Sequence, residues 1–254
     1  MVVCVLPNNR KDRYDALKVF LCVEDPVPSQ MVLRNTLAKR SLTIATKIVL
    51  QMECKMGGEL WAVQIPVNGL MVIGIDTYHD TLRRVQSVAG FIASLNNTCT
   101  RYYTCAKFQQ PGEELHNSLQ TLVTNALRRY HEVNAEVPKY VVVYRDGVGD
   151  GQVLTVQQHE VPQVSEALRS LAPQCKLMYI VVKKRIAARF FQLANGTEAN
   201  PPPGTVIDDL VTRPNAFDFF VVSQSVNRGT VNPASDTKNV VLSKLIFKCI
   251  IRFL

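Results

Sequence analysis

Val-Tyr-Arg-Asp-Gly-Val-Gly-Asp-Gly-Gln occupies residues 143–152 and directly continues the apolar run Val141–Val143. The valines predict a buried strand, and the glycines and aspartates after it predict an abrupt turn. In α/β proteins, a carboxylate at the end of a buried strand beside a Gly-rich loop is a common place for metal or phosphate chemistry. An acidic turn that caps a helix is an equally good interpretation of this composition alone.

Strand-like and helix-like segments alternate on both sides of this stretch. Their order around it (strand, strand, helix, strand, helix, strand) predicts an α/β fold with a mixed sheet. The pair Gly57-Gly58 is the best candidate for a domain boundary. The expected strands are 2–6, 59–66, 70–76, 88–95, 140–144, 177–182 and 217–223, and the expected helices are 11–22, 37–56, 112–133 and 153–171.

The bulk composition narrows the class of protein. Hydrophobic residues make up 47% and charged residues 20% of the 254 residues, which is typical of a globular protein. The formal net charge of +8 favours a polyanionic partner only weakly, because many globular proteins are equally basic. The seven cysteines are widely spaced, which predicts reduced thiols and no zinc site. No apolar run reaches membrane-spanning length, so no membrane association is expected.

Two strand-end carboxylates form the candidate catalytic site. Asp76 ends the apolar segment 71–75, as Asp146 ends the segment 141–144. If the two strands are neighbours, both side chains emerge at the same edge of the sheet and can hold Mg²⁺ or Mn²⁺. Such ions activate water and stabilise the leaving oxygen in phosphodiester cleavage. Each aspartate alone is a weak signal, because an aspartate at the end of a strand is usually a helix cap or a turn former.

The whole string 143–152 resembles the catalytic-aspartate segment of the Piwi clade of the Argonaute family. Gly74-Ile75-Asp76 resembles the segment with the first catalytic aspartate, and Asp146 matches the second. Gly112-Glu113-Glu114-Leu115 resembles the segment whose glutamate completes the family's tetrad, and Glu114 aligns with it because it precedes the Leu. The resemblance implies a ribonuclease-H-like mixed sheet with flanking helices, the catalytic residues Asp76, Glu114 and Asp146, and Mg²⁺ or Mn²⁺ at Asp76 and Asp146. Without it, the glutamates would be read as acids at a helix N-terminus.

The family's fourth ligand, a histidine, has no counterpart among His79, His116, His131 and His159. The family pattern ends after Gly229–Pro233. A site that lacks one ligand is weakened, so we expect weak or absent cleavage. The interpretations left open are an RNA-guided endoribonuclease, a non-cleaving RNA-binding protein, and a fragment or splice product that does not fold independently.

The first 58 residues resemble the second half of the Rossmann-like Mid domain, which grips the guide RNA 5′-phosphate in that family. Tyr14 and Lys18, four residues apart, share a helix face and suit an aromatic platform beside a cation. By resemblance the tyrosine stacks on the first guide base, and the other contacts come from Lys18, Gln30, Gln51 and Lys55. Singly, each of these residues is as well explained as a solvated side chain.

The resemblance covers residues 2–233 and divides the chain into a half Mid domain (1–58), an incomplete Piwi domain (59–233) and a divergent tail (234–254). It implies binding of a small guide RNA (piRNA) and a complementary target RNA, germline silencing of transposon or other RNAs, and Tudor-type protein partners. It places the protein in cytoplasmic perinuclear granules or in the nucleus. Lys183-Lys184-Arg185 and Arg189 are expected either to contact the guide–target backbone or to form a solvated charge run.

Overall fold

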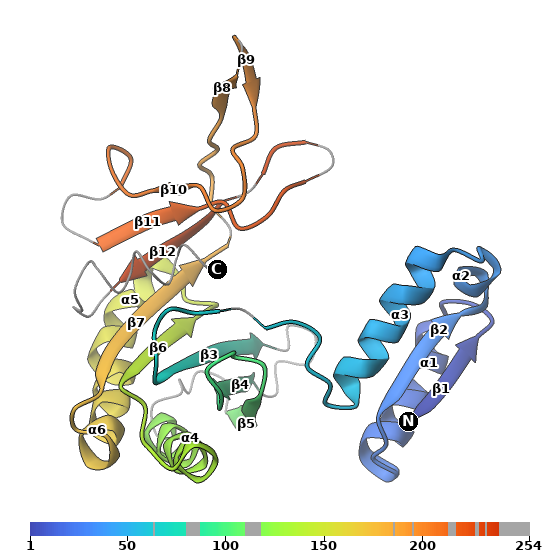
Figure 1. Ribbon diagram of the computed structural model, residues 1–254, viewed down its shortest axis with the longest axis horizontal. Coiled ribbons are helices and arrows are strands. Elements are labelled where there is room, and N and C mark those ends of the chain that lie inside the picture. The colour runs from blue at the N-terminus through green and yellow to red at the C-terminus, as the bar shows by residue number, and fades with distance from the viewer. Residues whose placement is uncertain are drawn as a thin grey trace. The chain divides into compact units, whose positions relative to one another are not determined.

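The chain forms two compact units, Met1–Ala62 (unit 1) and Val63–Leu254 (unit 2). Figure 1 shows the computed structural model as a ribbon. The sequence predicts the boundary just before this division, at Gly57-Gly58. The structure describes residues 1–62, 64–79, 87–109, 118–184, 186–194, 196–212, 217–226, 229–231 and 233–238.

Unit 1 has two parallel strands, β1 (Val2–Leu6) and β2 (Ser29–Leu33). The helix α1 (Lys11–Val19) connects them and continues into one wide turn, Phe20–Glu24. The segment 37–56, expected to be one helix, is instead the end of α2 (Arg34–Ala38) and the helix α3 (Leu42–Lys55). The helices separate at Arg40, whose φ of 46° does not fit a right-handed helix.

The way α3 ends explains why two glycines, Gly57 and Gly58, follow it. Gly57 has a φ of 88°, the left-handed conformation that glycine adopts at little cost. The N–H of Gly58 then donates to the carbonyl oxygen of Glu53 at 2.9 Å, which satisfies one of the last carbonyl groups of the helix.

The main sheet of unit 2 has eight strands in the order β10-β11-β12-β7-β6-β3-β4-β5. The central strands β3, β6 and β7 are parallel and the other pairs are antiparallel, so the predicted mixed sheet is confirmed. A separate hairpin consists of β8 and β9. The strands are β3 (Leu70–His79), β4 (Ser87–Ser94), β5 (Tyr102–Gln109), β6 (Tyr140–Arg145), β7 (Lys176–Lys183), β8 (Gln192–Ala194), β9 (Thr197–Ala199), β10 (Val206–Ile207), β11 (Phe217–Val221) and β12 (Ala234–Lys238).

Helices α4 (Leu119–Asn134) and α6 (Val161–Leu171) pack against each other and cover one face of the sheet (Figure 1). α4 buries residues at helical spacing, among them Leu119, Val123 and Leu127, because this stripe faces the sheet. The segment before α6 is helical in short pieces: Asp150–Gln152, α5 (Val153–Thr155) and a wide π turn at Val156–Glu160. No helix in the described ranges is long and apolar enough to cross a bilayer.

Several short strands escape a reading of the sequence. β5 is an edge strand that mixes polar and apolar residues, and β8, β9 and β10 have only two or three residues each. Residues 234–238, assigned by the resemblance to a divergent tail, pair as β12 between β7 and β11. The expected strand 59–66 has no regular structure in its described residues. The predicted helix 112–133 begins, within the described residues, at Leu119, and residues 110–117 lie outside them.

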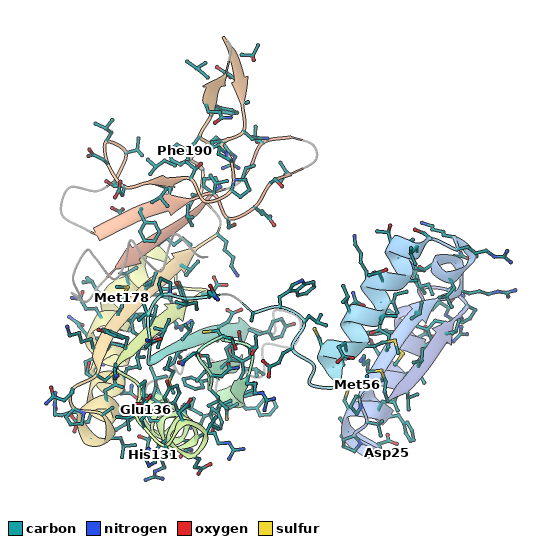
Figure 2. The ribbon with its side chains drawn as sticks, viewed as in Figure 1. Asp25, Met56, His131, Glu136, Met178 and Phe190 are labelled. Carbon is teal, nitrogen blue, oxygen red and sulfur yellow. The ribbon has the colours of Figure 1, made fainter. Side chains whose placement is uncertain are left out.

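The β8–β9 hairpin follows an aromatic contact with the sheet. Phe190, labelled in Figure 2, meets Phe220 of β11 edge to face, with the ring centroids 5.1 Å apart. This geometry is favourable for aromatic pairs beyond the burial of their area. Phe190, which belongs to the Arg-Phe-Phe segment of the family resemblance, therefore has a packing role here.

Candidate functional sites

Asp76 and Asp146 lie at one edge of the sheet because their strands are parallel neighbours. The register pairs Ile75 of β3 with Arg145 of β6. The backbone N–H of Asp146 then donates to the carbonyl oxygen of Ile75 at 2.9 Å. β6 ends at this point, whereas β3 continues beside β4 and pairs Asp76 with Gly90. The two carboxylates, 70 positions apart in the sequence, therefore line the same pocket.

The pocket at this edge has a volume of about 530 Å³. Oδ1 of each aspartate accepts a hydrogen bond from the next backbone N–H, Thr77 or Gly147, at 2.8 Å in both cases. These local bonds fix the direction of each carboxylate. The residues that line the pocket are Asp76, Asp146, Gly147, Val148, Gly149, Val182, Lys183 and Lys184.

Gly147 allows the two aspartates to approach. Its φ is 77°, and a Cβ atom built on it would lie 3.2 Å from Oδ1 of Asp76. Any other residue here would be strained in the backbone and would press on the carboxylate of Asp76. The glycine that follows Asp146 is thus required for a steric reason.

A cation already lies on this edge. The ammonium group of Lys184, in the segment after β7, donates to Oδ2 of Asp146. The pKa of Lys184 is raised, first by this hydrogen bond and also by the charges of Asp146 and Asp76. Both carboxylates therefore act on one cation, and hard oxygen ligands of this kind also suit Mg²⁺ or Mn²⁺. Asp76 and Asp146 fit a divalent metal as two of its ligands.

The third predicted catalytic acid cannot be placed. Glu114 lies outside the described residues, as does the side chain of His79. Among the residues that the structure describes, no group of three or more His, Cys, Asp or Glu side chains could hold a metal ion. The structure thus brings together two of the three predicted acids.

A buried polar network lies behind Asp146. Arg145 is 8% exposed, and its Nε donates to Oε2 and Oε1 of Glu160 at 3.0 and 3.2 Å. The hydroxyl group of Tyr179 donates to Oε2 of Glu160 at 2.5 Å. Burial lowers the pKa of Arg145, but Glu160 outweighs it and leaves that pKa raised. Burial and the charge of Glu160 raise the pKa of Tyr179 far above 10.0. Burial among apolar residues and Glu160 thus keep the phenol protonated.

In unit 1, four of the five predicted phosphate contacts form one hydrogen-bonded cluster. The ammonium group of Lys55 donates to Oε1 of Gln30 at 2.7 Å and to the carbonyl oxygen of Ser29 at 2.8 Å. Nε2 of Gln30 donates to Oε1 of Gln51 at 3.1 Å. Lys18 donates to the hydroxyl group of Ser29 at 3.2 Å. Helices α1 and α3 and strand β2 thus direct their polar groups to one place, which we call the cationic cluster (Lys18, Ser29, Gln30, Gln51 and Lys55).

Tyr14, the fifth predicted contact, lies beside this cluster. Nζ of Lys18 is 5.9 Å from the centroid of the Tyr14 ring, within the range of a cation–π interaction. Tyr14 is 43% exposed and borders a pocket of about 470 Å³ whose other walls include Leu6, Met31 and Leu33. An exposed aromatic face beside an apolar pocket suits the stacking of a planar base.

Several participating residues escape the sequence reasoning. Ser29 has no distinguishing pattern apart from its place next to Gln30, and its role appears only when β2 forms. Glu160 reads as an ordinary helix residue, although its side chain is 1% exposed. Of the basic segment after β7, Lys184 contacts Asp146, Arg189 donates to backbone carbonyls of Ile186 and Ala188, and Arg185 lies outside the described residues.

Comparisons with known proteins agree with the architecture. A family model described as the Piwi domain matches residues 1–245. Piwi-like protein 1 of Gallus gallus is 51% identical over 237 residues, which are 92% of this chain and 27% of that protein. Protein argonaute-3 of Drosophila melanogaster is 45% identical over 237 residues, 92% of this chain and 27% of that protein. The chain spans about a quarter of the length of these relatives.

Solved structures show the same fold. The crystal structure of Drosophila Piwi matches with a TM-score of 0.85 and 34% identity, over 98% of this chain and 35% of that one. The crystal structure of Kluyveromyces polysporus Argonaute with a guide RNA matches with a TM-score of 0.86, over 98% of this chain and 34% of that one. At 23% identity, this second likeness concerns the fold alone. The predicted α/β class with a ribonuclease-H-like mixed sheet is confirmed, and this chain belongs to the Piwi domain family.

Proposed function

We propose that this chain binds a small guide RNA (piRNA) by its 5′-phosphate and serves RNA-guided silencing of transposon or other target RNAs. The observation that carries the proposal is the cationic cluster of unit 1. Lys18 and Lys55 donate there to neutral oxygens of Ser29 and Gln30. Two ammonium groups among neutral partners keep their positive charge available for an anion.

A phosphate group suits this arrangement better than a carboxylate or a halide. Its several oxygens accept from more than one direction, and the donors of Lys18, Lys55 and Gln30 come from α1, α3 and β2. The exposed Tyr14 ring lies on the Lys18 side and offers a stacking surface. A terminal nucleotide satisfies both features, because its base and its 5′-phosphate are joined.

The proposal is tested by comparing a 5′-phosphorylated RNA with the same RNA carrying a 5′-hydroxyl group. We expect the full chain to bind the phosphorylated RNA about ten-fold more tightly, the effect of one charge-assisted contact. Lys55→Gln should remove most of this preference. Lys39→Gln, which removes an exposed lysine of unit 1 outside α3, is the matched control and should keep this preference. Equal affinity for both RNAs in the parent chain would refute the proposal.

A second candidate function is Mg²⁺- or Mn²⁺-dependent cleavage of the paired target RNA. It is favoured by the adjacent carboxylates of Asp76 and Asp146 and by the cation, Lys184, that they attract. A bound divalent metal would supply Lewis-acid stabilisation of the leaving oxygen. In this chain, Asp76 and Asp146 would hold the ion, and Gly147 keeps the room for both carboxylates.

The assay for this candidate uses Mn²⁺, a guide and a matched target RNA. Cleavage by the parent chain that is lost in Asp146→Ala would establish the endoribonuclease and would contradict our expectation of weak or absent cleavage. Target binding without cleavage would favour the non-cleaving RNA-binding protein.

The setting of this function is also proposed. We expect the protein in cytoplasmic perinuclear granules of germline cells or in the nucleus, with Tudor-type proteins as partners. Sequencing of small RNA that copurifies with the protein, together with mass spectrometry of the bound proteins, tests both points. Recovery of neither piRNA nor Tudor-type proteins would contradict this setting.

A further inference from the structure

Arg145, Glu160 and Tyr179 have no part in the proposed RNA contacts, yet all three are buried. Their exposed fractions are 8%, 1% and 0%. They come from three elements, β6, the wide turn before α6, and β7. Burial of an ion pair is weak evidence for stability, because apolar side chains of similar volume often do as well. The position of this network needs another explanation.

The guanidinium group of Arg145 is divided between two partners. Its Nε and Nη2 donate to the carboxylate of Glu160, at 3.0 and 3.1 Å for the shortest contact of each. Its Nη1 donates to the backbone carbonyl oxygen of Asp146 at 2.5 Å. The planar, forked geometry of arginine makes this division possible, since one rigid group reaches both acceptors.

Asp146 is consequently held through its backbone N–H, its backbone carbonyl group and its side chain. Its N–H donates to Ile75 of β3, its carbonyl oxygen accepts from Arg145, and its Oδ1 accepts from the N–H of Gly147. These bonds fix the peptide planes on both sides of the residue, and hence the direction in which its carboxylate leaves the chain. Tyr179 completes the arrangement because its hydroxyl group fixes Oε2, one of the two Glu160 oxygens that accept from Arg145.

We propose that Arg145, with Glu160 and Tyr179 behind it, is a positioning residue that aims the carboxylate of Asp146 at the metal position shared with Asp76. The effect of Arg145 on metal binding rests on the proposed metal site. The hydrogen bonds that position Asp146 do not. Outer partners of this kind commonly change metal affinity 10- to 100-fold when they are removed.

Two substitutions separate positioning from general stability. Arg145→Lys keeps a positive charge opposite Glu160, but its compact ammonium group lacks the fork that joins Glu160 to Asp146. Tyr179→Phe keeps the ring and removes only the hydroxyl group. Arg169→Lys is the matched control, because Arg169 forms an ion pair with Glu166 that is exposed on α6.

The experiment measures two quantities on the full chain. Hydrogen exchange of the backbone amides of residues 147–149 reports the order of the loop. Titration with Mn²⁺, followed by electron paramagnetic resonance, reports the metal site. For Arg145→Lys we expect the amide of Gly147 to exchange about ten-fold faster. We also expect Mn²⁺ to bind about ten-fold more weakly. Tyr179→Phe should shift both in the same direction by a smaller factor, and Arg169→Lys should shift neither.

The outcomes distinguish this inference from the function on which it rests. Unchanged exchange of residues 147–149 in folded Arg145→Lys and Tyr179→Phe would overturn the positioning role. If Arg145→Lys does not fold, Tyr179→Phe decides alone. If the parent chain binds no Mn²⁺, the metal proposal fails, and faster exchange in the variants still supports the positioning of Asp146. If Mn²⁺ binds and its affinity is equal in every variant, the aim toward the metal is refuted.

Discussion

The two candidate sites treat charge in opposite ways. In unit 1, Lys18 and Lys55 donate to neutral oxygens, so their charges stay available. In unit 2, two carboxylates form ion pairs with cations: Asp146 with Lys184, and Glu160 with Arg145. The comparison teaches that the first site recruits an anion to satisfy it, whereas the second must exchange one cation for another.

The sites also differ in what holds them in place. Helices α1 and α3, which carry four of the five predicted contacts of unit 1, bury no residue. The aspartates of unit 2 extend from strands whose preceding residues belong to the core, with Ile75 and Val143 almost fully buried. The position of the cationic cluster therefore depends on its own hydrogen bonds, and that of the aspartates on packing as well.

The largest expected effect concerns the buried ion pair. Glu160→Ala leaves Arg145 buried without its counter-charge, and should lower the free energy of unfolding of unit 2 by about 3–5 kcal/mol. Urea unfolding followed by circular dichroism measures this. Glu166→Ala removes an exposed partner of Arg169 and should cost no more than about 1 kcal/mol. Equal costs for the two variants would show that burial does not distinguish the pairs.

Removal of the Asp146 carboxylate, the proposed metal ligand, should have the second-largest effect. Asp146→Ala is expected to weaken Mn²⁺ binding more than about 100-fold, because loss of an outer partner alone costs 10- to 100-fold. Isothermal titration calorimetry measures the affinity. Glu198→Ala, an exposed acid on β9, removes the same charge far from the pocket lining and should leave the affinity unchanged. A shared loss would mean that net charge, not coordination, attracts the metal.

An anionic ligand should stabilise unit 1 and a cationic ligand should stabilise unit 2. A 5′-phosphorylated RNA at about 100 times its Kd should stabilise unit 1 by about 2.7 kcal/mol, and Mn²⁺ at a similar excess should do the same for unit 2. Peptide-resolved hydrogen exchange reads the two units separately in one sample. If either ligand protected both units equally, the contrast between an anion site and a cation site would break down.

A glycine pair separates backbone strain from contact. Gly147→Ala and Gly196→Ala both place a side chain at positive φ, 77° and 75°, and each should cost about 1–2 kcal/mol. A Cβ at Gly147 lies 3.2 Å from Asp76, whereas none of the atoms around Gly196 comes within 4 Å. Only Gly147→Ala should therefore weaken Mn²⁺ binding. Equal Mn²⁺ affinity in both variants would remove the steric role of Gly147.

The smallest effect concerns the thiols. Burial raises the pKa of the Cys175 thiol from 9.0 to about 12. Cys175 should therefore react with iodoacetamide at about pH 8.5 more slowly, by about ten-fold or more, than the exposed Cys22 and Cys54 of unit 1. The raised pKa also means that this thiol's contribution to stability is present below pH 9 and declines as the pH rises toward 12. Equal alkylation rates would contradict the burial of Cys175.

The sequence predicts the parts of the fold that apolar runs encode. The buried strands β3, β6 and β7 and the stripe of α4 follow from hydrophobic spacing, since burial dictates those residues. β5 and β12 have no such pattern because an edge strand and a polar strand are held by backbone pairing with their neighbours. The break at Arg40 escapes because a single residue at positive φ leaves the helical spacing on both sides intact.

The residues of the candidate sites also fall into those that the sequence predicts and those that it does not. Asp76 and Asp146 can be paired from sequence because both end apolar strands, so parallel neighbours bring them together. The contacts of Lys184 and Ser29, and the network around Glu160, depend on where chain segments meet after folding, which residue spacing does not report. Glu114 lies outside the described residues, and its role stays a prediction.

The pairing of β12 affects more than the extent of the sheet. Residues 234–238 form hydrogen-bonded ladders with β7 on one side and β11 on the other, so within the described residues β10 and β11 join the sheet through β12. A chain shortened to residue 233 would leave both neighbours with rows of unpaired backbone groups, a template for strand addition by another molecule. The first effect of removing this short polar segment is then self-association of the chain, and not disruption of the sheet edge that carries Asp76 and Asp146.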